Sequence, residues 1–369
     1  MPVILISSLD PFCRQAACES LGQRRPGSMT VLHDLLENGS VLRRIYRGRQ
    51  EVERVETPLE HGCLSCTVRL DVVPTVHRLL QDGAAELVVS LPPSVPADLV
   101  VEQFRHSADP APHIDSIITA CSPAGLEDQL WDTHTLFESG YTPTPGDDRT
   151  PGEFLIGELA YCDTVHCSDL VLAPAAPDAH SRGTRLVREI APHAAVVVPG
   201  KTGPLAGFDL REARARSRAG SVRIPAASSN APFRTAVLRA ARPLHPGRFR
   251  LALGELAAGN CWLRGRVWLA SAPTARIALR GYGPRVILED TGPWVADAPN
   301  PARAADPGSD AALDWHAEHG DRGTVLAVTG DSVDEAVAAG LLAGCELTAA
   351  DLAAGVGHLP DPFGLSAAH

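Results

Sequence analysis

The chain has 369 residues, of which 44% are hydrophobic, and a formal net charge of −11 at pH 7. This length exceeds one ordinary hydrophobic core and predicts two domains, while the negative charge disfavours broad binding to nucleic acid, so we expect no direct DNA binding. No run of about 18 apolar residues occurs, which predicts no membrane-spanning segment, and the 9 scattered cysteines favour a reducing, cytoplasmic location over a disulfide framework.

Short apolar segments alternate with helical patterns through the first half of the chain. Residues 3–7 lack the basic lead of a signal peptide and begin the series as a strand. Residues 41–55 alternate basic and apolar side chains, which predicts an exposed strand pair. Further strands are expected over 29–33, 86–91, 114–121, 164–172 and 194–198, and helices over 11–21, 96–106, 124–138, 151–161 and 181–190. This order predicts an α/β domain over residues 1–199 with a doubly wound, mostly parallel sheet that binds ligands at its carboxyl strand ends.

The composition changes after residue 199. Residues 200–232 are rich in Gly, Pro, Ser, Ala and Arg and predict a linker. Its basic segment Arg211–Arg218 is compatible with contact to RNA or an acidic partner, and with a solvated helix face. A smaller α+β domain is expected over 233–358, followed by a tail over 359–369. Its strands are expected over 236–240, 261–271, 276–280, 285–289, 294–297 and 324–329, and its helices over 246–256 and 333–342, the second capped by Asp331 and Ser332.

Two cysteines at C-x-x-C spacing form the strongest candidate metal site. Cys63 and Cys66 follow Gly62 where a loop passes into a helix whose apolar pattern opens at Asp71. Such a turn lets two sulfurs face one point, as a soft divalent metal requires. Zinc needs about four ligands, and the residues that could complete the set are Glu60, His61, His33 and His77. The alternative is a tight turn with two free thiols that serves as a docking surface, with Arg69 and Asp71 as its polar contacts.

Residues 4–15 occupy the strand–turn–helix position of a phosphate-binding loop. Such a loop needs glycines for close backbone approach, a lysine for the phosphates and a Ser or Thr for magnesium. This stretch contains Ser8 but no glycine, and Arg14 and Gln15 stand where Lys and Thr would. The one lysine of the chain, Lys201, follows another strand but lacks the upstream glycine. Ser8, Arg14 and Gln15 therefore mark a degenerate nucleotide-binding loop.

Hydrolase motifs are missing from the sequence. Neither G-x-S-x-G nor H-E-x-x-H occurs. His316 and His319 flank Glu318, and we expect them to be surface residues and not ligands. Thr150, with Glu153 three residues later, predicts a helix cap.

Taken together, several motifs resemble those of the CobW-like family of P-loop GTPases, which are associated with metal-cofactor delivery. The family loop Gly-Cys-x-Cys-Cys-Thr-hydrophobic-Arg corresponds to Gly62–Arg69 here. Residues 242–246, 264–270 and 292–294 resemble motifs of the CobW C-terminal domain. The resemblance implies a P-loop-GTPase-like first domain, a CobW C-terminal second domain, and zinc at Cys63, Cys66 and His61.

Within this family, the sequence is most similar to the ribosome hibernation factor-recruiting GTPases of actinobacterial type. That subgroup has a His-Gly-Cys-x-Ser-Cys-Thr-x-Arg loop, as at His61–Arg69, and an Asp-Pro-Phe-Gly tail, as at Asp361–Gly364. The resemblance implies that the partners are the ribosome and a hibernation factor, brought together under zinc limitation.

The sequence departs from the family pattern at four places. Ser65 replaces the middle cysteine, the phosphate loop is lost at Ser8–Gln15, residues 173–176 lack the guanine-reading motif, and Ser90 stands where an acidic residue ends the third strand. Three hypotheses follow. The chain is a catalytically degenerate binding protein that docks a partner on the ribosome, or it is a zinc metallochaperone with residual GTP hydrolysis that uses Arg14 as its phosphate cation. The third is a related protein whose sheet serves only as a structural partner.

Overall fold

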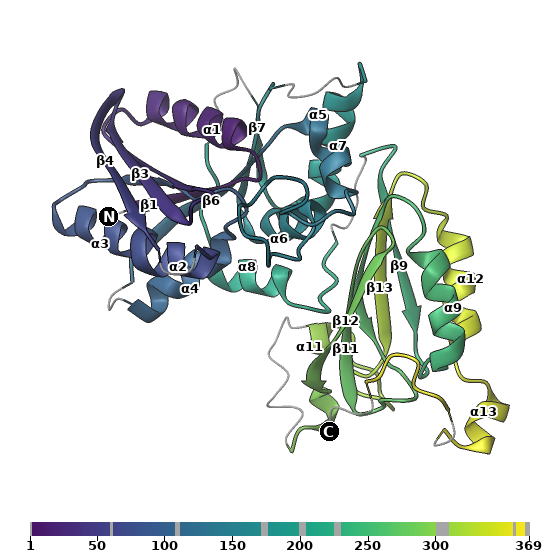
Figure 1. Ribbon diagram of the computed structural model, residues 1–369. Helices are drawn as coiled ribbons and strands as arrows, with labels where there is room; N and C mark the ends of the chain where they lie inside the picture. The colour runs from purple at the N-terminus through teal and green to yellow at the C-terminus, as the bar shows by residue number, and fades with distance from the viewer. Residues whose placement is uncertain are drawn as a thin grey trace. The chain divides into compact units, whose positions relative to one another are not determined.

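The computed structural model describes residues 2–59, 62–107, 111–170, 176–198, 204–224, 230–299, 310–356 and 359–365. The chain divides into two compact units, Met1–Arg214 and Ala215–His369, and the division lies inside the stretch 200–232 (Figure 1). Within the described residues, no helix has the length and apolar character needed to cross a membrane.

In the described part of the first unit, eight strands form one sheet. They are β1 (Pro2–Ser7), β2 (Met29–Leu35), β3 (Ser40–Arg47), β4 (Gln50–Pro58), β5 (Leu87–Ser90), β6 (His113–Cys121), β7 (Thr164–Cys167) and β8 (Ala195–Val197). The helices are α1 (Pro11–Arg24), α2 (Leu64–Thr67), the π-helical turn η1 (Val68–Val72), α3 (Val73–Gln81), α4 (Ala97–Ser107), α5 (Pro123–Leu130), α6 (Pro151–Tyr161), α7 (Ala179–Ile190) and α8 (Leu210–Ser217). Helix α8 runs across the division between the units.

The strand order in this sheet is β4-β3-β2-β5-β1-β6-β7-β8. The six strands from β2 to β8 in that order pair in parallel, and the β3–β4 hairpin adds two antiparallel strands at one edge. The predicted α/β class with a mostly parallel sheet is therefore confirmed, and so is the exposed strand pair. Because β1, β2, β5 and β6 are parallel, their carboxyl ends lie at the same end of the sheet. The site described below is built at this end.

Helices cover both faces of the sheet (Figure 1). On one face, Cys13, Ala17 and Leu21 of α1 pack against Ile4 and Ile6 of β1 in a buried cluster. Helices α3 and α4 lie on the opposite face. Burial on both faces explains why the central strands are nearly continuous apolar runs.

The second unit is built on a five-stranded antiparallel sheet in the order β12-β11-β10-β13-β9. Its strands are β9 (Arg234–Ala240), β10 (Cys261–Val267), β11 (Ala275–Tyr282), β12 (Arg285–Pro293) and β13 (Thr324–Gly330). Its helices are α9 (Pro246–Leu256), the 3-10 turn η2 (Val295–Asp297), α11 (Asp310–Leu313), α12 (Glu335–Cys345) and α13 (Ala349–Ala354).

The core of the second unit lies between its sheet and the helices α9 and α12, which run side by side (Figure 1). Phe249 of α9 and Leu342 of α12 are buried there against sheet residues such as Leu263 and Leu279. Phe363, in the stretch predicted as a tail, packs against this core, with its ring centroid 6.1 Å from that of Phe249. The predicted α+β class is confirmed.

Three predicted elements are wrong in detail. The helix expected over 124–138 ends at Leu130, because Asp132 turns the chain by accepting a hydrogen bond from the His134 N–H at 2.9 Å. In place of the strand expected over 294–297, the structure has η2 at Val295–Asp297, where the Asp321 carboxylate accepts the N–H groups of Val295 and Ala296. The predicted caps of the last long helix are wrong as well, and Asp334 caps α12 instead.

Candidate functional site

The loop from β1 to α1 is closed by its own side chains. The Asp10 carboxylate accepts hydrogen bonds from the backbone N–H groups of Phe12 at 2.7 Å and Cys13 at 3.0 Å. Ser8 Oγ donates to the Ala120 carbonyl at 2.7 Å. In a phosphate loop, the N–H groups at a helix start hold an anionic phosphate. Here a carboxylate of the same chain takes that position.

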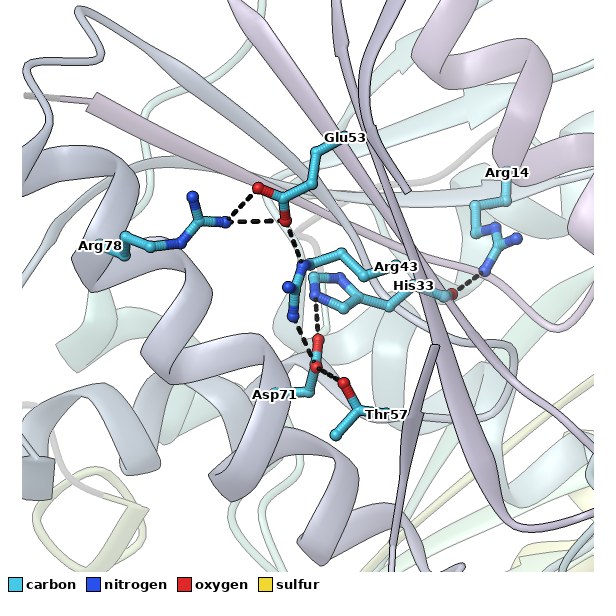
Figure 2. Close-up of polar contacts among 7 residues, drawn as sticks. All are labelled: Arg14, His33, Arg43, Glu53, Thr57, Asp71 and Arg78. Atoms are coloured by element: carbon cyan, nitrogen blue, oxygen red, sulfur yellow. Dashed lines mark hydrogen bonds and ion pairs between the residues drawn. The ribbon is translucent and has the colours of Figure 1, made fainter. Parts of the chain in front are cut away.

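Arg14 is buried, with 2% of its surface exposed. Its Nη1 donates to the carbonyl oxygen of His33 at 2.8 Å (Figure 2). The same Nη1 donates to the Leu91 carbonyl at 2.8 Å, and Nη2 forms an ion pair with Asp34. The guanidinium therefore ties α1 to the carboxyl ends of β2 and β5. Although burial raises the pKa of Asp34, the charges and hydrogen bonds of Arg14 and Arg44 outweigh it and hold that pKa below its usual value.

The three residues of the degenerate loop do not share one site. Gln15 is exposed and donates to Glu19 at 2.9 Å, one turn further along α1. Ser8 and Arg14 point into the protein and use their polar atoms there. Sequence reasoning missed the role of Asp10, although Asp10 followed by Pro11 is a helix-start signal. Residues 173–175 and Lys201 lie outside the described residues.

Cys63 and Cys66 meet at the start of a helical run that extends from α2 through η1 to α3. Cys63 is the N-cap, and its Sγ accepts a hydrogen bond from the Cys66 N–H at 3.3 Å. Both thiols are half-buried, and Ser65 between them is exposed. The helix begins at Leu64, earlier than the predicted start at Asp71.

The two thiols have different acidities. Burial raises the pKa of Cys63, but hydrogen bonds from the Cys66 thiol and from the N–H groups of Cys66 and Ser65 outweigh it and lower that pKa below 9.0. The pKa of Cys66 is raised, because its thiol donates to Cys63 and faces the charge there. The two sulfurs therefore differ in how readily they form the thiolate that binds soft metals, and Cys63 ionises before Cys66.

The remaining ligands of a complete zinc site are not assembled around this pair. Among the described residues, no third Cys, His, Asp or Glu donor converges with the two sulfurs. Glu60 and His61 lie outside the described residues. His33 and His77 are not available: His33 faces Asp71, and His77 packs its ring on Phe104 with centroids 6.0 Å apart. The two thiols fit a soft cation but supply half of its usual ligands.

The cysteine loop is held against the β2–β3 turn by a close backbone approach. A Cβ added to Gly62 would lie 2.6 Å from the Gly39 Cα, and Gly39 itself has a φ of +80°. Thr144 Oγ1 donates to the Gly62 carbonyl at 3.3 Å. Cys63 and Ser65 line a hollow of about 310 Å³ beside the loop, together with Leu64, Pro96, Leu99, Thr144, Gly146, Asp147 and Arg149.

A network of polar and charged side chains surrounds Asp71 (Figure 2). His33 Nε2 is 3.2 Å from Asp71 Oδ1, while Asp71 Oδ2 accepts from Arg43 Nη1 at 2.6 Å and from Thr57 Oγ1 at 3.1 Å. Glu53 accepts from the Nε of the same arginine at 3.0 Å. The hypothesis of Asp71 as a surface docking contact is wrong, because 2% of this residue is exposed.

Asp71 reaches this network from the π-helical turn η1. The Val73 N–H bonds to the Val68 carbonyl five residues back, and Pro74 follows directly. Proline has no N–H, and its ring crowds the carbonyl four residues before it, so a widened turn accommodates it. The network joins β2, β3, β4 and η1, and it fixes the helix whose first residues carry the two cysteines.

Comparison with known proteins gives a partial match. Residues 233–346 match the model of the cobalamin synthesis protein cobW C-terminal domain. The chain is 28% identical to "Zinc chaperone Rv0106" of Mycobacterium tuberculosis over 291 residues. This match covers 74% of this chain and 69% of that protein. It is equally similar to "Uncharacterized protein Mb0109" of Mycobacterium bovis.

Two solved structures are also similar. The Zn(II)-bound YjiA GTPase from E. coli aligns over 94% of this chain and 99% of its own, with 10% identity and a TM-score of 0.37. A Zn(II)-bound triple mutant of YjiA aligns with 11% identity and the same TM-score and coverage. The second unit of this chain therefore contains a cobalamin synthesis protein cobW C-terminal domain, in a protein similar to a mycobacterial zinc chaperone.

Proposed function

We propose that this protein binds Zn²⁺ at Cys63 and Cys66 and exchanges it with a partner protein, without hydrolysing GTP. The observation that carries the proposal is the pair of half-buried cysteines at the helix start, where Cys63 Sγ accepts the Cys66 N–H and its pKa is lowered. Thiolates are ligands that soft divalent cations prefer. The similarity to a zinc chaperone supports the same cargo.

We infer that zinc is exchanged because the cysteine pair supplies too few ligands to complete the coordination of the metal. Two protein sulfurs leave up to two positions on a tetrahedral zinc for water or for donors of another protein. The loop is half-buried and stands beside the hollow lined by Asp147 and Arg149, so a partner donor can reach the metal. His61 remains the proposed third ligand. A site of this kind releases zinc more readily than a closed four-ligand site.

The closed phosphate loop supports the absence of GTP hydrolysis. A bound phosphate would have to displace the Asp10 carboxylate from the helix start and would meet no free cation at Arg14. Each charge-assisted hydrogen bond lost costs about 1.5–3 kcal/mol. The same contacts argue against the residual-GTPase hypothesis, because that hypothesis requires Arg14 to face the phosphates.

Zinc binding is tested by metal analysis of the full chain after dialysis. We expect close to one zinc per chain to be lost in Cys63→Ser/Cys66→Ser. Ser65→Cys restores a third sulfur on an exposed position of the loop and should tighten binding under chelator competition. Equal zinc content in the wild type and the double variant would refute the proposal.

Nucleotide binding is tested by titration with a fluorescent GTP analogue. We expect no saturable binding below millimolar concentrations, with or without magnesium. Submicromolar affinity together with magnesium-dependent hydrolysis would restore the residual-GTPase hypothesis.

Recruitment of a hibernation factor to the ribosome is a second proposal for the partner. A scaffold whose phosphate loop is closed acts through docking and not through turnover, which favours a recruiting role. Co-sedimentation with ribosomes, with and without a hibernation factor and a zinc chelator, tests it. Absence of the protein from the ribosomal pellet under all four conditions would exclude this partner.

A further inference from the structure

We propose a second site for a divalent transition metal in the C-terminal unit, formed by His316, Glu318 and His319. The ligand atoms of these three side chains all lie within 4.8 Å of one another. The sequence favours surface residues at these positions, but the loop turns all three donors toward one point. The site is independent of the cysteine pair, which belongs to the other unit.

Backbone contacts fix the shape of the turn from His316 to Gly320. His316 and Gly320 exchange two hydrogen bonds, with the His316 N–H donating at 2.7 Å and the Gly320 N–H at 2.9 Å. Gly320 has a φ of +65°, and a Cβ there would lie 2.4 Å from that of Ala296. The five-residue turn is therefore narrow, and the donors need little rearrangement to bind a cation.

The two imidazoles are held in place by neighbouring groups. The Glu318 N–H donates to His316 Nδ1 at 3.2 Å, which fixes the orientation of this ring within the turn. The His319 ring stacks on His316 with centroids 5.0 Å apart and packs on Trp268 at 5.3 Å. These contacts limit the rotation of His319 and hold it beside the other donors.

The neighbouring charges leave Glu318 free for a cation. Arg322 forms an ion pair with Asp297 and donates to the His319 carbonyl. The Asp321 carboxylate is taken by the N–H groups of η2. The side chain of Glu318 is 79% exposed, and its carboxylate lies 3.8 Å from His319 Nε2.

The donor set selects the class of metal. Two imidazole nitrogens and one carboxylate oxygen suit Zn²⁺, Co²⁺, Ni²⁺ or Cu²⁺ and disfavour Mg²⁺ and Ca²⁺, which prefer oxygen ligands. Three protein ligands leave a fourth position of a tetrahedral site open to water. The inferred site is thus an exchangeable Zn²⁺ site without sulfur.

Cobalt titration of the full chain tests the site, because Co²⁺ bound to thiolate shows a near-ultraviolet charge-transfer band that Co²⁺ bound to His and Glu does not. In a Cys63→Ser/Cys66→Ser background, we expect one Co²⁺ per chain without that band. Adding His316→Ala/His319→Ala should abolish this binding, and Glu318→Gln should weaken it about tenfold or more. Adding His106→Ala, an exposed histidine of the first unit, should leave it unchanged.

The outcomes separate this inference from the proposed function. No binding in the cysteine-free background, or unchanged binding after His316→Ala/His319→Ala, overturns the C-terminal site. A missing thiolate band in the wild type, with one Co²⁺ still lost in His316→Ala/His319→Ala, refutes the cysteine site and keeps the C-terminal one. Glu318→Gln alters only an exposed side chain, so its weaker binding cannot come from unfolding.

Discussion

Asp10 and Arg14 use the chain's own charges where a phosphate loop would hold a ligand. The carboxylate binds the helix-start N–H groups, and the guanidinium binds the carbonyl ends of two strands. Both charged groups therefore have partners within the protein and stabilise it in the absence of a nucleotide.

Replacing Asp10 by Ala should lower the free energy of unfolding by about 1 kcal/mol, because α1 loses its cap. Asp10→Asn keeps a side-chain oxygen and should be close to neutral. Urea unfolding followed by circular dichroism measures both. Equal losses for Asn and Ala would show that the charge, and not the cap, is the stabilising feature.

Cys63 should react with iodoacetamide faster than Cys66 near pH 8. Its pKa lies below 9.0 and that of Cys66 above, so its thiolate forms at lower pH. Cys18 is an internal control, since burial raises the pKa of that thiol to about 11. Peptide mass spectrometry across a pH series gives the rates, and zinc should protect both loop cysteines. Equal rates for Cys63 and Cys18 would contradict the assignment.

At the scale of elements, the network around Asp71 couples the hairpin strands to the helix of the cysteine loop. Burial raises the pKa of Asp71, but hydrogen bonds and charges from His33 and Arg43 lower it more. A carboxylate whose pKa is lower in the folded state stabilises the fold above its unfolded pKa, and this stabilisation is lost as the pH falls through the folded pKa.

Asp71→Asn should therefore lower the free energy of unfolding by about 3–5 kcal/mol at neutral pH, because it leaves buried charges unpaired. The difference from the wild type should shrink as the pH falls below about 4. Denaturant unfolding at several pH values measures it. A difference that stays constant down to acidic pH would show that the carboxylate charge contributes nothing.

Gly62→Ala should loosen the cysteine loop, since the new Cβ would approach the Gly39 backbone at 2.6 Å. We expect weaker zinc binding with little change in the rest of the fold. Gly157→Ala is a matched control, because no atom lies within 4 Å of a Cβ at that helical position. Zinc titration of both variants compares them. Wild-type affinity in Gly62→Ala would mean that the loop position is not fixed by this contact.

The sequence predicted the features that depend on neighbouring residues, but it did not predict contacts between residues that lie far apart in the chain. The strand pair at 41–55 and the capping box of Thr150 and Glu153 depend on neighbouring residues and are confirmed. His33 and Asp71 meet only after β2 and η1 are placed, so no spacing rule links them. The same holds for Asp34 and Arg14, whose pairing decides how the degenerate loop is filled.

At the scale of the whole molecule, the two units have separate sheets and cores, so we expect two unfolding transitions. One of the 5 tryptophans, Trp131, lies in the first unit, so Trp131→Phe confines the emission to the second. In a His316→Ala/His319→Ala background, zinc at one hundred times its dissociation constant should stabilise the first unit by about 2.7 kcal/mol.

This shift should appear in far-ultraviolet circular dichroism and not in tryptophan emission. The Cys63→Ser/Cys66→Ser variant is the control, and in it zinc should move neither signal. Equal zinc-induced shifts of emission and dichroism would show that the two units unfold as one.

The filled phosphate loop has a consequence for the direction of metal traffic. A carrier that couples metal transfer to nucleotide hydrolysis can move its cargo against a concentration gradient, whereas the function proposed above, with Asp10 and Arg14 occupying the loop, includes no hydrolysis to drive the transfer. Its exchange is an equilibrium, so a reservoir with a higher free zinc level loads the protein and a tighter-binding recipient empties it. The same chain would then donate zinc when the free zinc level is low and store zinc when it is high.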